Sequence, residues 1–114
     1  MKPEETKNLI ESVEDFKTTF LGTRTSSLGV EENVAVDDSK RMMHVLSVGP
    51  TGYGKTQLLL HVALQDAYKG NGFCVINPKG NLIDELIAKL PQHRLEDIVY
   101  INPARDPVTP INVL

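Results

Sequence analysis

The spacing of apolar residues divides the first part of the chain into a helical and an extended stretch. Residues 2–17 carry apolar side chains at helical spacing between charged ones, which predicts an amphipathic helix. Over residues 20–37, glycine, serine and threonine interrupt the pattern, so we expect a loose hairpin or an extended lead-in there. The acidic residues that follow predict a polar turn over residues 37–39.

From residue 44 onward the pattern becomes more regular. Short runs of apolar, mostly β-branched residues predict strands over residues 44–48, 73–76 and 98–101. Two helical stretches lie between them: residues 55–69, apolar on most sides, and residues 81–90, apolar along one stripe. The order strand, helix, strand, helix, strand is typical of a parallel sheet with right-handed crossovers, which predicts an α/β fold.

Composition limits the classes of protein to consider. The chain has 114 residues, enough for one small domain, and a formal net charge of -3, which excludes a strongly basic nucleic-acid binder at the level of the whole chain. A single cysteine excludes an internal disulfide. No apolar run approaches the ~20 residues that a membrane helix needs. With no secretory signal visible at the charged N-terminus, we expect a cytoplasmic location, at the inner face of the membrane if partners hold it there.

The loop after the first predicted strand carries the clearest chemistry. Residues 49–56 match the phosphate-loop pattern G-x-x-x-x-G-K-[ST] at every required position, between a strand and a helix. Backbone N–H groups of such a loop and the start of the helix bind phosphate oxygens, and glycine permits the dihedrals. Lys55 would reach the β- and γ-phosphates of ATP, and the Thr56 hydroxyl would bind Mg²⁺. The alternative is a chance glycine turn.

The expected nucleotide-binding residues are Gly49, Pro50, Thr51, Gly52, Tyr53, Gly54, Lys55, Thr56 and Gln57. Tyr53 stands where a small residue is more common, so its ring either covers the nucleotide, meets a neighbouring subunit or lies on the surface. Hydrolysis also needs an Asp on a neighbouring strand that supports Mg²⁺. The later predicted strands end instead in the neutral Asn77 and Asn102, while the acidic pair at positions 84–85 falls on a helix.

Other candidate residues have both a functional and a structural interpretation. Lys79 follows a predicted strand at the same edge as the phosphate loop and either touches phosphate or a partner or is a solvated lysine. Arg105 is either an arginine finger or a surface residue. Cys74 lies in an apolar strand, so we expect an inert core residue. Three histidines show no metal-ligand spacing: His44, His61 and His93.

Beyond the phosphate loop, three short motifs follow in a recognisable order. They are Asn-Pro-Lys-Gly-Asn at 77–81, Asn-Pro-Ala at 102–104 and Ile-Asn-Val-Leu at 111–114. Residues 44–114 thereby resemble the start of the motor domain of the HerA/FtsK superfamily, closest to type IV secretion coupling proteins of the TraD type and their archaeal and viral relatives. Asn77, Asn81 and Asn102 stand where that family usually has Asp.

The resemblance implies a three-layer P-loop NTPase fold with a parallel sheet. Residues 1–40 would form an N-terminal helix and β lead-in, and residues 41–114 the P-loop domain, truncated before Walker B. Such proteins are usually hexameric ATPases that pump DNA, so ATP, Mg²⁺, DNA and copies of the same chain are the implied partners. Lys55 would be the catalytic residue.

Because the flanking strands of that family come later in the sequence, this chain would be a marginal monomer, a fragment or a piece completed by another chain. The alternative is a non-catalytic nucleotide-binding or regulatory subunit that joins a full-length ring. A small P-loop kinase is a third hypothesis, but nothing in the sequence looks like an acceptor site or lid arginines.

Overall fold

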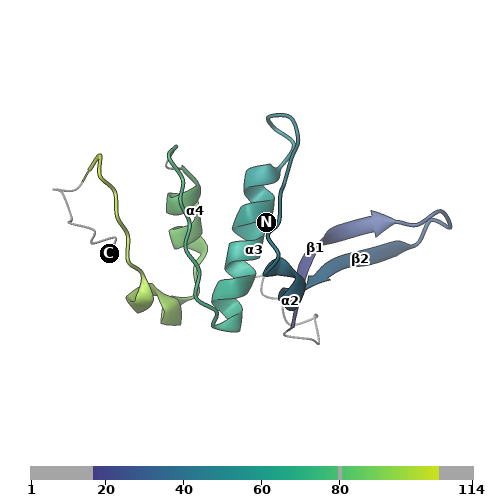
Figure 1. Cartoon of the computed structure of the whole chain (residues 1–114), viewed down its shortest axis with the longest axis horizontal. Helices are drawn as coiled ribbons and strands as arrows, with labels where there is room; N and C mark the ends of the chain where they lie inside the picture. Colours follow the sequence, from purple (N-terminus) through teal and green to yellow (C-terminus); the bar gives the residue numbers. More distant parts are fainter. Residues whose placement is uncertain (1–16, 80, 106–114) are drawn as a thin grey trace.

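The computed structural model describes residues 17–79 and 81–105 (Figure 1). The predicted helix over residues 2–17 lies almost wholly outside these ranges, as does the motif at 111–114. The described elements are β1 (Thr18–Thr25), β2 (Glu31–Asp37), α2 (Asp38–Arg41), α3 (Lys55–Lys69), α4 (Asn81–Lys89) and a 3₁₀ helix, η1 (Gln92–Asp97).

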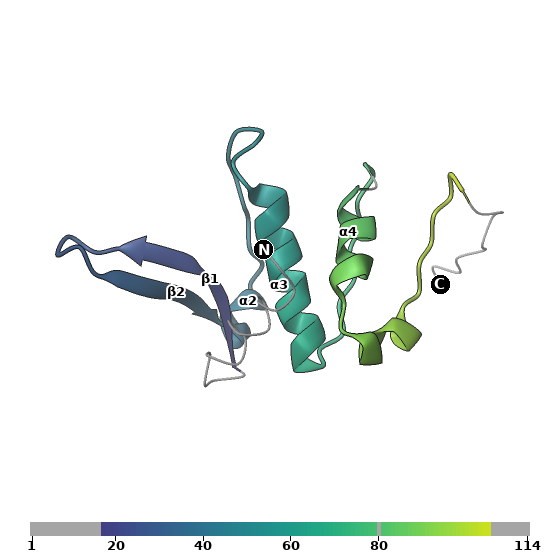
Figure 2. The ribbon, with the colours of Figure 1, turned by 180° about the vertical axis from the view of Figure 1, so that it is seen from behind.

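Strands β1 and β2 form an antiparallel hairpin that projects away from the helices (Figures 1 and 2). The register runs from Thr18 opposite Asp37 to Thr25 opposite Glu31, with an irregularity between Phe20 and Gly22. This hairpin occupies the stretch expected to be a loose hairpin or lead-in. Of the residues predicted as a polar turn, Asp37 ends β2, and residues 38 and 39 begin α2, a single helical turn that follows β2 directly.

Helix α3 confirms the helix predicted over residues 55–69, and glycines with left-handed φ flank both of its ends. One side packs against α4 in an apolar cluster of Leu60, Ala63, Leu64, Leu82 and Leu86. Leu59, in contrast, is 54% exposed, so α3 is not buried on every side. In the described part of the chain, no helix is long and apolar enough to cross a membrane.

The predicted parallel sheet is wrong. Within residues 17–79 and 81–105 the single sheet is the two-stranded antiparallel hairpin, so a three-layer P-loop fold is not supported. The stretches around the three predicted strands are extended, and all three run from the η1 end toward the opposite end of the molecule (Figures 1 and 2). No backbone hydrogen bond joins any two of them in the described ranges.

The packing of the helices gives a physical reason for the missing sheet. Each of the first two extended segments runs beside the helix that follows it, and α3 and α4 pack side by side. Each of these segments lies on its own helix, and no strand of the described ranges pairs with it. A parallel ladder joins segments that are distant along the chain, so it depends on tertiary packing that the local pattern does not fix. The chain order of a βαβαβ unit is present, but its hydrogen-bonded ladder is not.

The side chains of the extended segments are exposed because no hydrogen-bonded sheet forms around them in the part of the chain that the structure describes. Leu46 is 87% exposed and Ile76 is 90% exposed, although both belong to runs that predict buried strands. Cys74, expected to be a core residue, is also exposed. Val75 is the residue of its segment that packs against the apolar cluster of α3 and α4.

Candidate functional site

The phosphate-loop sequence forms an exposed turn at one end of the molecule, between the first extended segment and α3 (Figure 1). Gly52 and Gly54 adopt left-handed φ values of 87° and 82°. No neighbouring atom lies within 4 Å of the place a Cβ would take at either glycine. These glycines are therefore required for the backbone conformation, and the space beside their Cα atoms is open.

The side chain of Lys55 folds back over the loop and bonds to it. Its Nζ donates a hydrogen bond of 2.6 Å to the backbone oxygen of Pro50. Its aliphatic stem lies over Gly49, because a Cβ built on that glycine would stand 3.9 Å from the lysine Cδ. The ammonium group is thus held inside the turn and not against a carboxylate.

The start of α3 has unpaired donors. Its first helical hydrogen bond runs from the Leu58 amide to the Gly54 oxygen at 2.9 Å, so the amides of residues 55–57 have no partner within the helix. Gly54 brings no side-chain cap, and the first turn contains no acidic residue. Together with Lys55, this gives the loop an uncompensated positive end.

The other expected loop residues differ in where they point. Thr56 is exposed at the start of α3, and Tyr53 is 79% exposed. Gln57 instead reaches α4, where its Nε2 lies 3.4 and 3.5 Å from the two carboxylate oxygens of Glu85. Among residues 17–79 and 81–105, no group of three or more His, Cys, Asp or Glu side chains is placed to hold a metal.

Glu85 was expected to lie on the solvent side of a helix, and the sequence gives no signal of its contact with Gln57. It also accepts a hydrogen bond of 2.6 Å from Lys89, one turn further along α4. The Lys89 ammonium, with a smaller contribution from Gln57, lowers the pKa of Glu85 below its usual value. The carboxylate is therefore engaged as part of an exposed ion pair.

Two asparagines form matching turns at the ends of the later extended segments. The Asn77 side-chain oxygen accepts the Lys79 amide at 3.0 Å, and that of Asn102 accepts the Ala104 amide at 3.1 Å. Both turns lie at the same end as the phosphate loop (Figure 1), and both carry an exposed basic residue, Lys79 or Arg105. A neutral amide serves this turn as well as a carboxylate does, because one side-chain oxygen is enough.

A second polar cluster joins the base of the hairpin to the C-terminal half of α3. Asp66 pairs with Arg41 of α2 through two hydrogen bonds of 2.9 and 2.6 Å. Lys69 binds Asp38 at 2.8 Å and also donates to the Thr18 backbone oxygen. Between them, the fully buried Thr19 donates to Asp38 and accepts from Arg41.

These pairings set the ionisation of the cluster. Burial opposes ionisation of Asp38 and Asp66, but the surrounding donors outweigh it and lower both pKa values. The main donors are Lys69 and Thr19 for Asp38, and Arg41 for Asp66. Hydrogen bonding to Asp66 correspondingly raises the pKa of Arg41. Asp38, Asp66 and Arg41 are therefore ionised at neutral pH, and each has a partner of opposite charge in the cluster.

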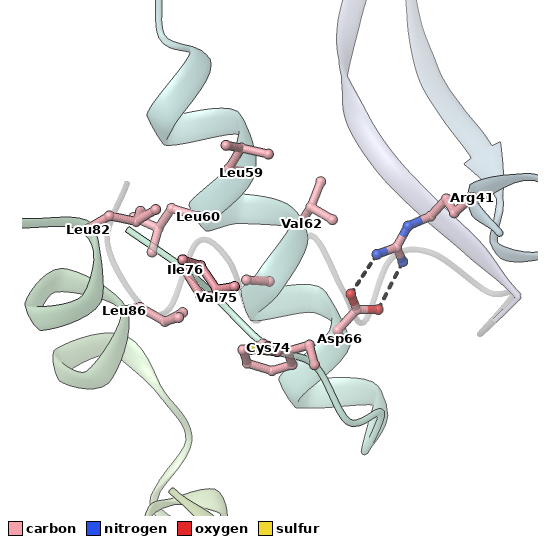
Figure 3. Close-up of a pocket in the computed structure, with 12 residues that line it drawn as sticks. Arg41, Leu59, Leu60, Val62, Asp66, Cys74, Val75, Ile76, Leu82 and Leu86 are labelled. Atoms are coloured by element: carbon pink, nitrogen blue, oxygen red, sulfur yellow. Dashed lines mark hydrogen bonds and ion pairs between the residues drawn. The ribbon is translucent and has the colours of Figure 1, made fainter. Parts of the chain in front are cut away.

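An apolar cavity of about 320 Å³ lies between α3, the second extended segment and α4 (Figure 3). Side chains such as Leu59, Val62, Ile76 and Leu82 line it, and the Arg41–Asp66 pair forms its polar border. Those two charges already satisfy each other, and the Cys74 thiol is the other chemically reactive group in the lining. The phosphate loop remains the candidate site.

Comparison with known proteins adds no relative: no family model, curated protein or solved structure matches this chain. The likeness to HerA/FtsK motors rests on the motifs alone.

Proposed function

We propose that this chain binds ATP with Mg²⁺ through the loop of residues 49–56. The observation that carries the proposal is the position of Lys55, whose ammonium group bonds to the loop's own Pro50 carbonyl beside the uncapped start of α3. Backbone amides at a helix start and a neighbouring ammonium group together form an anion site.

A phosphate group fits this arrangement better than the present contact does. The Pro50 oxygen is a neutral acceptor, whereas a phosphate oxygen carries negative charge and so attracts the Lys55 ammonium group more strongly. The amides of residues 55–57 would supply further donors without the cost of separating existing helical bonds. Thr56 would contribute one oxygen to Mg²⁺, an ion that usually keeps several waters and binds phosphate oxygens.

The wider role that we propose is nucleotide binding as part of a DNA-translocating ATPase, in which Lys55 would act on the β- and γ-phosphates. This part rests on the order of motifs shared with the HerA/FtsK superfamily. An alternative, a nucleotide-binding subunit without catalysis, gains support from Asn77 and Asn102. Their side-chain oxygens accept backbone amides, and both lack the charge that would support Mg²⁺.

The test is a titration of the whole chain with a Mg²⁺-bound, non-hydrolysable ATP analogue, followed by calorimetry. We expect saturable binding by the wild-type chain. Lys55→Ala removes a charge-assisted hydrogen bond of about 1.5–3 kcal/mol, so its affinity should fall by about 10- to 100-fold.

Lys79→Ala is the matched control, because Lys79 is an exposed lysine at the same end of the molecule. It should bind within about twofold of wild type. Equal loss in both variants would indicate general charge attraction, and no saturable binding by the wild type would overturn the proposal. Phosphate release measured in parallel should be absent from the chain alone under both hypotheses, so release would favour the translocating ATPase over the non-catalytic alternative.

A further inference from the structure

The hairpin is attached to α3 through an unusual set of contacts at Phe20. The side chain of Gln65 accepts a hydrogen bond from the Phe20 amide and donates one to the Phe20 oxygen, both at 2.8 Å. A helix side chain thereby holds the strand as a neighbouring strand would. One turn earlier on α3, the ring of His61 meets the Phe20 ring edge to face, with centroids 5.8 Å apart.

His61 is the polar group without a partner in this junction. Its residue is 8% exposed, and its Nε2 is buried with no hydrogen-bond partner. Burial lowers the pKa of His61, because the charged imidazolium loses its hydration there. The ring is therefore neutral at pH 7 and packs as an aromatic side chain.

We propose that the contact between β1 and α3 is a proton-operated latch, closed while His61 is neutral and opened when it takes up a proton. A proton on Nε2 places both a charge and a donor without an acceptor against the Phe20 ring. Leaving a buried charged donor unpaired is costly. Lifting β1 from the helix relieves that cost, because water then reaches the imidazolium and the Phe20 backbone.

The other ionisable groups around the junction are paired with one another. They are Asp38 and Arg41 on α2, Asp66 and Lys69 on α3, Asp37 at the end of β2 with Lys40 on α2, and Glu85 and Lys89 on α4. Strand β1 brings the Thr19 hydroxyl and the Phe20 ring. The paired acids Asp38 and Asp66 have lowered pKa values, so they stay charged to below 3.8. His61 is the group of this junction whose added proton would find no acceptor.

The direction of the effect follows from proton linkage. His61 binds protons more weakly in the closed latch than in the open one, where its pKa is near the usual 6.5. The closed state is therefore fully favoured above pH 6.5 and loses stability as the pH falls below it. One proton limits the change to about tenfold in the closed-to-open ratio per pH unit.

Hydrogen exchange of the Phe20 amide reports the latch directly, since that amide donates to Gln65. After correction for intrinsic rates, its protection in the wild-type chain should fall between about pH 7.5 and 5, by no more than about tenfold per pH unit. His61→Phe keeps an aromatic ring against Phe20 but cannot take a proton, so its protection should not change with pH. His93→Phe removes an exposed histidine and should behave as wild type does.

A titration of the wild-type imidazole by NMR keeps the test independent of any variant's folding. The His61 signal should titrate below 6.5, over the same range in which Phe20 protection is lost. Protection that does not change with pH in the wild type would overturn the latch, as would the same loss in His61→Phe or an ordinary titration of His61. None of these outcomes depends on nucleotide binding.

Discussion

The junction between the hairpin and α3 and the three extended segments show opposite outcomes. At the junction, polar groups are paired across elements, and Thr19 is fully buried. In the extended segments, aliphatic residues such as Leu46 and Ile76 lie almost fully exposed. Strands therefore pair here where a short turn joins them in an antiparallel hairpin, whereas the more apolar segments, separated by helices, do not pair within the described ranges.

The largest expected difference in stability comes from truncating to alanine one leucine of the α3–α4 cluster and one leucine of the first extended segment. Leu64→Ala opens a cavity in the α3–α4 cluster, where Leu64 is 3% exposed, and should cost about 2–5 kcal/mol of unfolding free energy. Leu46→Ala, at an 87% exposed position, should stay within about 0.5 kcal/mol of wild type. Urea unfolding followed by circular dichroism measures both. A comparable loss at Leu46 would show that the first extended segment is packed in solution.

The next largest effect concerns ion pairs. Asp66→Ala leaves Arg41 without the partner that binds it through two hydrogen bonds in the partly buried cluster, and should cost about 3 kcal/mol. The matched control is Glu32→Ala, which breaks the exposed pair with Arg24 on the projecting hairpin and should cost about 0.5 kcal/mol or less. The same urea series compares them. Equal costs would mean that the base of the hairpin is no better protected than its tip.

The sequence allowed the local elements to be predicted better than their assembly. Helix α3 begins and ends where the pattern placed it, because the flanking Gly54 and Gly70 supply left-handed φ values that end a helix cleanly. The parallel sheet was wrong, since strand spacing depends on how α3 and α4 pack, which periodicity does not report. Cys74 was assigned to the core for the same reason.

The loop residues were located from the sequence, but several contacts around them were not. Lys55 lies at the loop as its motif requires, whereas the contact of Gln57 with Glu85 joins residues 28 positions apart and leaves no local pattern. The cluster of Arg41, Asp66 and Lys69 was also missed. Its members are ordinary charged residues of amphipathic segments, and only the docking of the hairpin brings them together.

Acid should destabilise the junction between the hairpin and α3, because it protonates the carboxylates there. Because Asp38 and Asp66 have lowered pKa values, their contribution to stability is complete above 3.8 and is lost as the pH falls below it. Each group limits the slope to about 1.4 kcal/mol per pH unit. Thermal unfolding from about pH 5 to 2 should therefore show a falling melting temperature, and Asp66→Asn should flatten the fall. An unchanged slope in Asp66→Asn would assign the acid sensitivity to other groups.

The smallest effect tests the boundary between the two regions, where α3 ends and the second extended segment begins. Gly70 has a left-handed φ of 80°, and its amide bonds back to the Ala67 oxygen at 3.2 Å. Gly70→Ala keeps that amide but puts a Cβ on left-handed backbone, so it should cost about 1 kcal/mol. Gly72→Ala, two residues on, has an open surrounding and no left-handed φ, and should be neutral or slightly stabilising by reducing the freedom of the unfolded chain. If urea unfolding gave both variants the same stability, the sharp end of α3 would not exist in solution, and the segment after it would be free to continue the helix.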